Sequence, residues 1–99
     1  MEATVSQLSE AADDFLIPLR LGDGYIDEKF QRLCQAIRAV NARYNASETI
    51  PKNCAITLVE LFPLIEGCKS LYGDAVRMKL DMAYATLFDL IGEGLATED

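Results

Sequence analysis

Apolar residues recur every three to four positions along this chain, and no stretch shows the strict alternation of a half-buried β-strand. Four such stripes are present, over about residues 4–17, 24–44, 51–72 and 74–91. A repeat of this kind places apolar side chains on one face of an α-helix. The pattern therefore predicts an all-α fold with four helices.

The first helix is expected to be the shortest of the four. Thr4 and Gln7 have the spacing of a capping box, so a start near Thr4 fits the sequence. Pro18 lacks an amide hydrogen and crowds the carbonyl four residues before it. We therefore expect the helix to end or to bend at Pro18.

The third stripe is the widest and predicts the central, most buried helix. A helix that is apolar over most of its circumference is usually buried over most of it. Pro63 lies in the middle of this segment and is expected to bend it. The apolar positions are Cys54, Ala55, Leu58, Val59, Leu61, Phe62, Leu64, Ile65, Cys68, Leu71 and Tyr72.

The fourth helix carries two apolar faces. One is the main stripe, and the opposite one is formed by Met78, Met82 and Ala85. Either the other helices wrap around this helix, or the second face is exposed and binds a partner helix or a second copy of the chain. Both interpretations stay open at this point. Beyond Ile91, the segment GEGLATED is expected to fray.

The connections between the stripes are short, which makes consecutive helices antiparallel neighbours. We expect residues 1–99 to form a single domain. Its architecture is predicted as an up-down antiparallel helical bundle of three long helices plus a shorter N-terminal helix. A chain of 99 residues has a small core, so dimerisation is a plausible way to complete it.

Charge and composition narrow the class of partner. The chain is 51% hydrophobic, has a net charge of −7 and contains no histidine. That charge repels nucleic acid and suits a basic protein partner. The absence of histidine removes the commonest general base and metal ligand. No apolar run is long enough for a membrane span, and the acidic start is unlike a signal peptide. We therefore expect a cytoplasmic protein.

The segment GDGYIDEKF, Gly22–Phe30, resembles the second half of an EF-hand calcium loop. With Asp23 at loop position 5, the first, third and twelfth positions fall on Leu19, Leu21 and Phe30, which are hydrocarbon rather than carboxylate. The resemblance therefore fails at the ligands, and we expect no metal. The same residues are explained as a glycine turn, with Asp23 as the cap of the second helix.

Two features have both a structural and a functional interpretation. Cys54 and Cys68 lie on one apolar face, some 20 Å apart along a helix, and are expected to be core residues rather than reactive thiols. The second helix carries the basic residues of a candidate anion site, or else these residues pair with acidic neighbours within the fold. They are Arg32, Arg38 and Arg43.

No catalytic constellation is present, and no cofactor is expected. The sequence favours a small acidic protein that is not an enzyme and acts by binding another protein, as an adaptor, chaperone, antitoxin or immunity-type regulator. It is expected to be a homodimer, with Met78, Met82 and Ala85 in the interface. The alternative is a small ligand-binding protein or enzyme that holds an anionic molecule with the arginines of the second helix. A purely structural oligomerisation module is a third hypothesis.

Overall fold

The computed structural model describes residues 3–44 and 52–95. Within these ranges the elements are helices, and no strand is present, so the all-α prediction is confirmed. In chain order they are α1 (Ala3–Arg20), α2 (Asp27–Tyr44), α3 (Lys52–Cys68), the short 3-10 turn η1 (Lys69–Leu71) and α4 (Asp74–Leu95).

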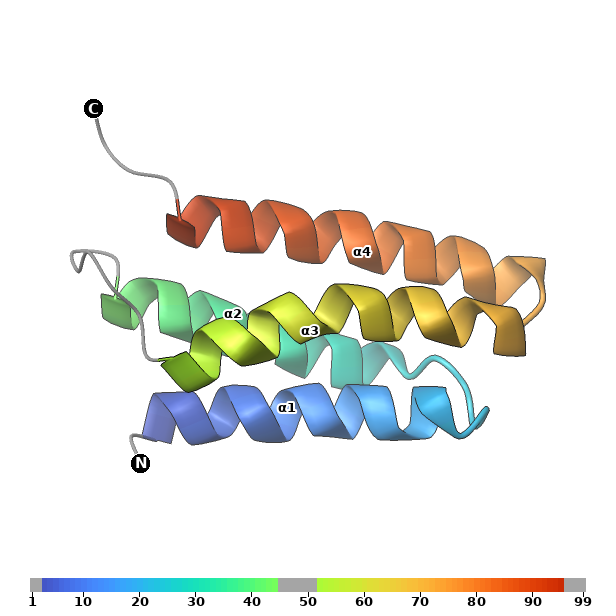
Figure 1. Cartoon of the computed structure of the whole chain (residues 1–99), viewed down its shortest axis with the longest axis horizontal. Helices are drawn as coiled ribbons and strands as arrows, with labels where there is room; N and C mark the ends of the chain where they lie inside the picture. The colour runs from blue at the N-terminus through green and yellow to red at the C-terminus, as the bar shows by residue number, and fades with distance from the viewer. Residues whose placement is uncertain (1–2, 45–51, 96–99) are drawn as a thin grey trace.

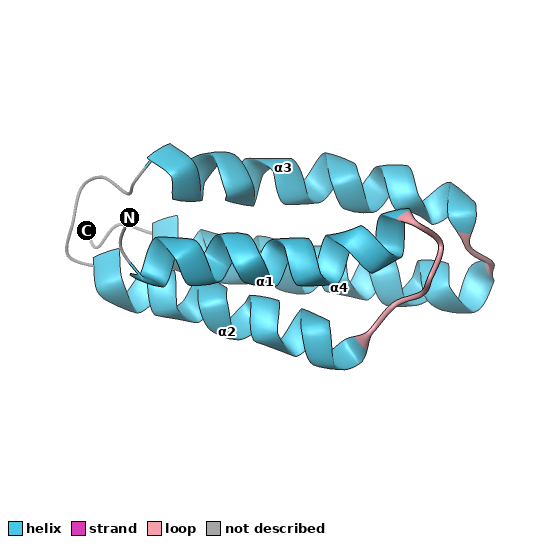
Figure 2. Cartoon of the chain, turned by 90° about the horizontal axis from the view of Figure 1, so that it is seen from below, coloured by secondary structure: helices cyan, strands magenta, loops and turns pink. Residues whose placement is uncertain are grey.

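The four helices lie side by side, and the chain runs back and forth between the two ends of the molecule (Figures 1 and 2). Helix α1 packs against both α2 and α3, and α4 packs mainly against α2. Helices α3 and α4 are joined by a short connection but diverge from it, so that they touch each other less than the other packed pairs do (Figure 1).

The core is built from the main apolar stripe of each helix. Among the described side chains, no polar or charged one is buried. Burying each of the large apolar side chains contributes about 1.5–3 kcal/mol, so these positions carry most of the stability. The most fully buried large side chains are Leu8, Phe15, Leu19, Leu33, Ile37, Val40, Leu61, Ile65, Leu80 and Leu87.

Helix α1 is not shorter than the others, and that prediction is wrong. It has 18 residues, as α2 does, and it continues through Pro18 to Arg20. Pro18 lies in the last turn, where it removes only one intrahelical hydrogen bond. The turn is held by Leu19, whose side chain is fully buried, and by the Asp23 N–H, which donates to the Pro18 carbonyl at 2.8 Å.

Helix α3 is not the central helix that its wide apolar pattern predicts. The face formed by Leu61 and Ile65 is buried, but Ile56 and Val59 are 47% and 70% exposed. These side chains are in solvent because no described element covers this flank of α3. The helix runs unbroken through Pro63. Pro51, its expected first residue, lies outside the described residues.

Because of the glycine turn, α2 starts further along the chain than the sequence pattern predicts. Gly22 and Gly24 have φ values of +80° and +124°, in the left-handed region that glycine tolerates and a helix excludes. The first helical carbonyl is that of Ile26, which accepts the N–H of Phe30 at 3.1 Å. Asp23 is therefore not the cap of α2, and the predicted start at residue 24 is three residues early.

At the other end of the chain, α4 continues past Ile91 to Leu95. The predicted fraying is thus wrong for residues 92–95, and residues 96–99 lie outside the described range. None of the helices described for residues 3–44 and 52–95 combines the length and the hydropathy needed to cross a membrane.

Candidate interaction surface

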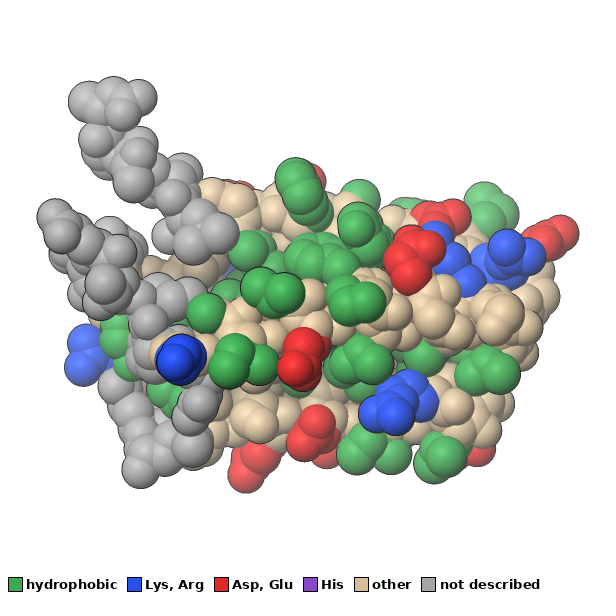
Figure 3. Space-filling view, viewed as in Figure 1, with side chains coloured by type: hydrophobic (Ala, Val, Ile, Leu, Met, Phe, Trp, Pro, Cys, Tyr) green, Lys and Arg blue, Asp and Glu red, His purple; other side chains and the backbone are tan. Residues whose placement is uncertain are grey.

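Exposed apolar side chains gather on the side of the molecule where α3 and α4 diverge (Figure 3). Val59 of α3 is 70% exposed and Phe88 of α4 is 64% exposed. An apolar patch of this extent on a small protein commonly marks an interaction site. We call this surface the α3–α4 face and define it by Ile56, Val59, Phe62, Tyr84 and Phe88.

Aromatic side chains form the floor of the α3–α4 face. The ring of Phe62 lies 4.7 Å from that of Tyr84 and 6.3 Å from that of Phe88, measured between centroids. Such contacts are typical of favourable aromatic pairs. Phe62 and Tyr84 are half-buried, so the rings join the two helices while part of their surface stays in contact with solvent.

The three residues predicted for an interface lie on α4 next to this face. Met78 and Met82 are 66% and 70% exposed, and Ala85 is exposed as well. Within residues 3–44 and 52–95, the other helices do not wrap around this strip. We call Met78, Met82 and Ala85 the methionine strip. Ala85 and Phe88 are three residues apart and therefore neighbours on the helix surface, so the strip continues the α3–α4 face.

Ion pairs close the end of the α3–α4 hairpin. The Lys69 ammonium group contacts Glu66 at 2.8 Å and also the carboxylate of Asp81 on α4. Hydrogen bonds to Asp81 and Glu66 raise the pKa of Lys69. Surface pairs of this kind add little stability, but they hold η1 against α4. Lys69, Glu66 and Asp81 are therefore paired with one another within the chain, whereas the α3–α4 face further along is apolar.

The three arginines of the candidate anion site do not converge. Arg32 and Arg43 are eleven positions apart on α2, about 16 Å along the axis, and Arg38 lies on another side of the helix. Arg32 pairs with Glu28 at 2.8 Å. The Arg43 guanidinium lies 5.2 Å from the centroid of the Tyr44 ring.

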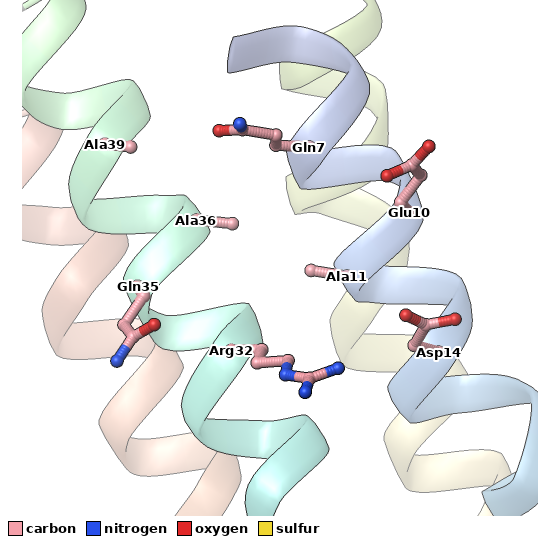
Figure 4. A pocket seen from close by; sticks show the side chains of 8 residues that line it. All are labelled: Gln7, Glu10, Ala11, Asp14, Arg32, Gln35, Ala36 and Ala39. Carbon is pink, nitrogen blue, oxygen red and sulfur yellow. The ribbon is translucent and has the colours of Figure 1, made fainter. Parts of the chain in front are cut away.

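Arg32 also lines a groove of about 320 Å³ between α1 and α2 (Figure 4). Its side chain extends from α2 toward α1, where Asp14 lies. The groove contains two carboxylates and one guanidinium, so its charge does not favour an anion. Its lining residues are Gln7, Glu10, Ala11, Asp14, Arg32, Gln35, Ala36 and Ala39.

The segment that resembles a calcium loop has a structural role. Leu19 and Phe30, at the first and last ligand positions, are core side chains that are 0% and 6% exposed. The ring of Tyr25 packs 5.5 Å from that of Phe15 and 5.9 Å from that of Phe30. Burial, together with the nearby charges of Asp27 and Cys34, raises the pKa of Tyr25 to about 12.

The Tyr72 side chain links the α1–α2 loop to the α3–α4 connection. Its hydroxyl donates to the Leu19 carbonyl at 2.7 Å and accepts the Gly24 N–H at 3.1 Å. One side chain from the α3–α4 connection therefore caps α1 and fixes the α1–α2 loop. In the sequence, Tyr72 is recognisable only as a member of an apolar stripe, because the pattern gives no sign of partners some fifty residues away.

The expectation that Cys54 and Cys68 are core residues is confirmed, since they are 1% and 4% exposed. Cys34 is also buried. Burial raises the pKa values of Cys34 and Cys68, and Arg38 and Arg20 respectively offset part of that rise. Arg20 belongs to α1, and sequence spacing did not indicate that its charge would act on Cys68.

Among these features, the α3–α4 face with its methionine strip stands apart. Arg32 and Tyr72 bind groups within the chain, whereas the exposed side chains of the face have no helix over them within the described residues. Comparison of the sequence and the fold with protein-family models, curated proteins and solved structures finds no match.

Proposed function

We propose that this protein acts by binding another protein through the α3–α4 face and the methionine strip, and that it is not an enzyme. The carrying observation is the exposure of Val59, Met82 and Phe88, between 64% and 70%. Ile56 and Met78 are exposed as well, at 47% and 66%. Five large apolar side chains in solvent on two helices of a small protein are typical of an interaction site.

The simplest occupant is a second copy of the chain. In this proposal the four helices form an up-down antiparallel bundle that dimerisation completes, with α4 packed against α4 of the partner. A two-fold interface brings the same strip of both copies together. Methionine suits such a contact because its side chain adapts to irregular shapes. Ala85, being small, allows a close approach of the two helices.

The net charge of the chain predicts how self-association depends on salt. Each copy carries a net charge of −7, so association works against like-charge repulsion. Salt screens this repulsion, and the Debye length falls to about 8 Å at physiological ionic strength. Self-association should therefore strengthen when the salt concentration rises, as expected for an apolar interface between acidic proteins.

The proposed setting is the cytoplasm, and the proposed role is that of an adaptor, chaperone, antitoxin or immunity-type regulator. An odd number of cysteines, all of them buried, suits a reducing compartment. A basic protein is the natural heterologous partner for a surface of this charge. The alternative function, retention of an anionic molecule by the arginines of α2, is the weaker proposal because Glu10 and Asp14 share the groove of Arg32.

Sedimentation velocity at micromolar concentration tests the homodimer. We expect the wild-type chain to be dimeric and Met82→Glu to be monomeric. Gln31→Glu is the matched control, because it adds the same charge at an exposed position of α2 and should remain dimeric. A monomeric wild type at low and high salt would exclude self-association. A dimer that survives Met82→Glu would place its interface elsewhere.

A further inference from the structure

A second hollow lies between the end of α1 and the end of α3, and it shares no lining residue with the α3–α4 face. Its volume is about 250 Å³, and Pro63, Leu64 and Leu71 give it apolar walls. Arg20 supplies one cationic group, and Gly67 and Cys68 complete the lining. An apolar hollow with a single well-placed charge is the usual composition of a small-molecule site.

Arg20 has no acidic partner within residues 3–44 and 52–95. By contrast, Arg32 and Lys69 both pair with carboxylates. The charge of Arg20 acts on Cys68, which also lines the hollow. Burial raises the pKa of Cys68, and Arg20 offsets part of that rise. Two of the α1 carbonyls that would oppose an anion are already engaged, that of Leu19 by Tyr72 and that of Pro18 by the Asp23 N–H.

Gly67 is the second independent sign of a site. It is the next-to-last residue of α3, where glycine costs up to about 1 kcal/mol relative to alanine, the value for a helix interior. Its φ is not positive, and a Cβ added there would meet nothing within 4 Å. Neither backbone conformation nor close packing therefore calls for glycine at this position. Its missing side chain does leave the hollow open.

We propose that this hollow binds a short anionic amphiphile, with its acyl chain against Pro63, Leu64 and Leu71 and its carboxylate on Arg20. A methylene group occupies about the ~30 Å³ of a water molecule, so the volume accommodates a chain of roughly eight carbons. The proposal is independent of protein binding at the α3–α4 face, because none of the residues that define that face lines the hollow.

The first test compares three probes of equal chain length, namely sodium octanoate, octan-1-ol and octylammonium chloride. Each is titrated into the isotope-labelled protein, and the amide resonances are followed by NMR. We expect saturable shifts at Arg20, Gly67 and Leu71. Octanoate should bind about fivefold more tightly than octan-1-ol, the gain expected from one partly exposed ion pair. Octylammonium should bind most weakly.

Two variants separate the charge from the cavity. Arg20→Gln should remove the preference for octanoate over octan-1-ol, whereas Arg77→Gln, which deletes an exposed charge on α4, should retain it. Gly67→Leu should fill the hollow and abolish binding of both probes. Because it also improves helix propensity, it should raise the melting temperature, so that lost binding cannot be attributed to unfolding.

Four results would each overturn the proposal. One is the absence of saturation with octanoate, and another is equal affinity for the cationic and the anionic probe. The other two are shifts centred on the α3–α4 face and unchanged binding in Gly67→Leu, because either would place the amphiphile outside this hollow.

Discussion

Replacing Tyr72 with phenylalanine removes a single oxygen atom that joins three parts of the chain. The hydroxyl donates to the Leu19 carbonyl at the end of α1 and accepts the N–H of Gly24 in the α1–α2 loop. The ring itself stays, so apolar packing is conserved. Tyr72→Phe therefore measures the bridge alone.

The expected loss in the free energy of unfolding depends on which hydrogen bonds the Leu19 carbonyl and the Gly24 N–H keep in Tyr72→Phe. The Leu19 carbonyl also accepts the Gly22 N–H at 3.2 Å and keeps that bond, whereas the Gly24 N–H loses its described partner. A hydrogen bond contributes about 0.5–1.5 kcal/mol net. Gly24 is half-buried, and water can partly replace the hydroxyl. We expect a loss of about 1–2 kcal/mol in the free energy of unfolding, against a typical total of ~5–15 kcal/mol.

Urea unfolding followed by circular dichroism measures this loss. The midpoint should fall with an unchanged m-value, and the melting temperature should drop by roughly 5–15 °C. Amide exchange at Gly24 should accelerate as well. Tyr84→Phe is the matched control, because the Tyr84 hydroxyl has no partner among the described residues. If Tyr72→Phe is as stable as Tyr84→Phe, the bridge contributes nothing and the reasoning fails.

Three further predictions concern the core and its titratable groups. Leu61→Ala should lower the unfolding free energy by about 2–5 kcal/mol in a urea titration, whereas Val59→Ala should change it by less than about 0.5 kcal/mol. The Tyr25 phenol should ionise near pH 12 in an absorbance titration, unless the fold opens first. Raised thiol pKa values mean that the folded state holds these protons more tightly, so the stability contributed by Cys34 and Cys68 should be constant below pH 9.0, the ordinary thiol value, and should fall above it.

The helices could be predicted because one face of each is buried. Leu33 and Ile37, or Leu80 and Leu87, recur at helical spacing, and the structure places all of them in the core. The pattern also shows that the methionine strip lies opposite this stripe, but only the packing of α4 shows that it is exposed. Local periodicity thus carries the information about which residues face inward.

The helix boundaries and the burial of α3 depend on contacts that periodicity does not contain. Pro18 is tolerated because distant partners hold the last turn of α1, and α2 starts late because Gly24 is left-handed. The apolar flank at Val59 is indistinguishable in sequence from a buried one. It is in solvent because no described element covers this flank of α3.

The exposed α3–α4 face and the methionine strip are not part of the core of a single chain. That core consists of the main stripe of each helix, and no described polar side chain is buried in it. Val59, Met82 and Phe88 therefore add little to the stability of a single chain, while each exposes apolar area that favours aggregation. Surface positions of this kind tolerate polar residues at almost no cost in stability. Their apolar character is better explained by what the chain binds than by how it folds.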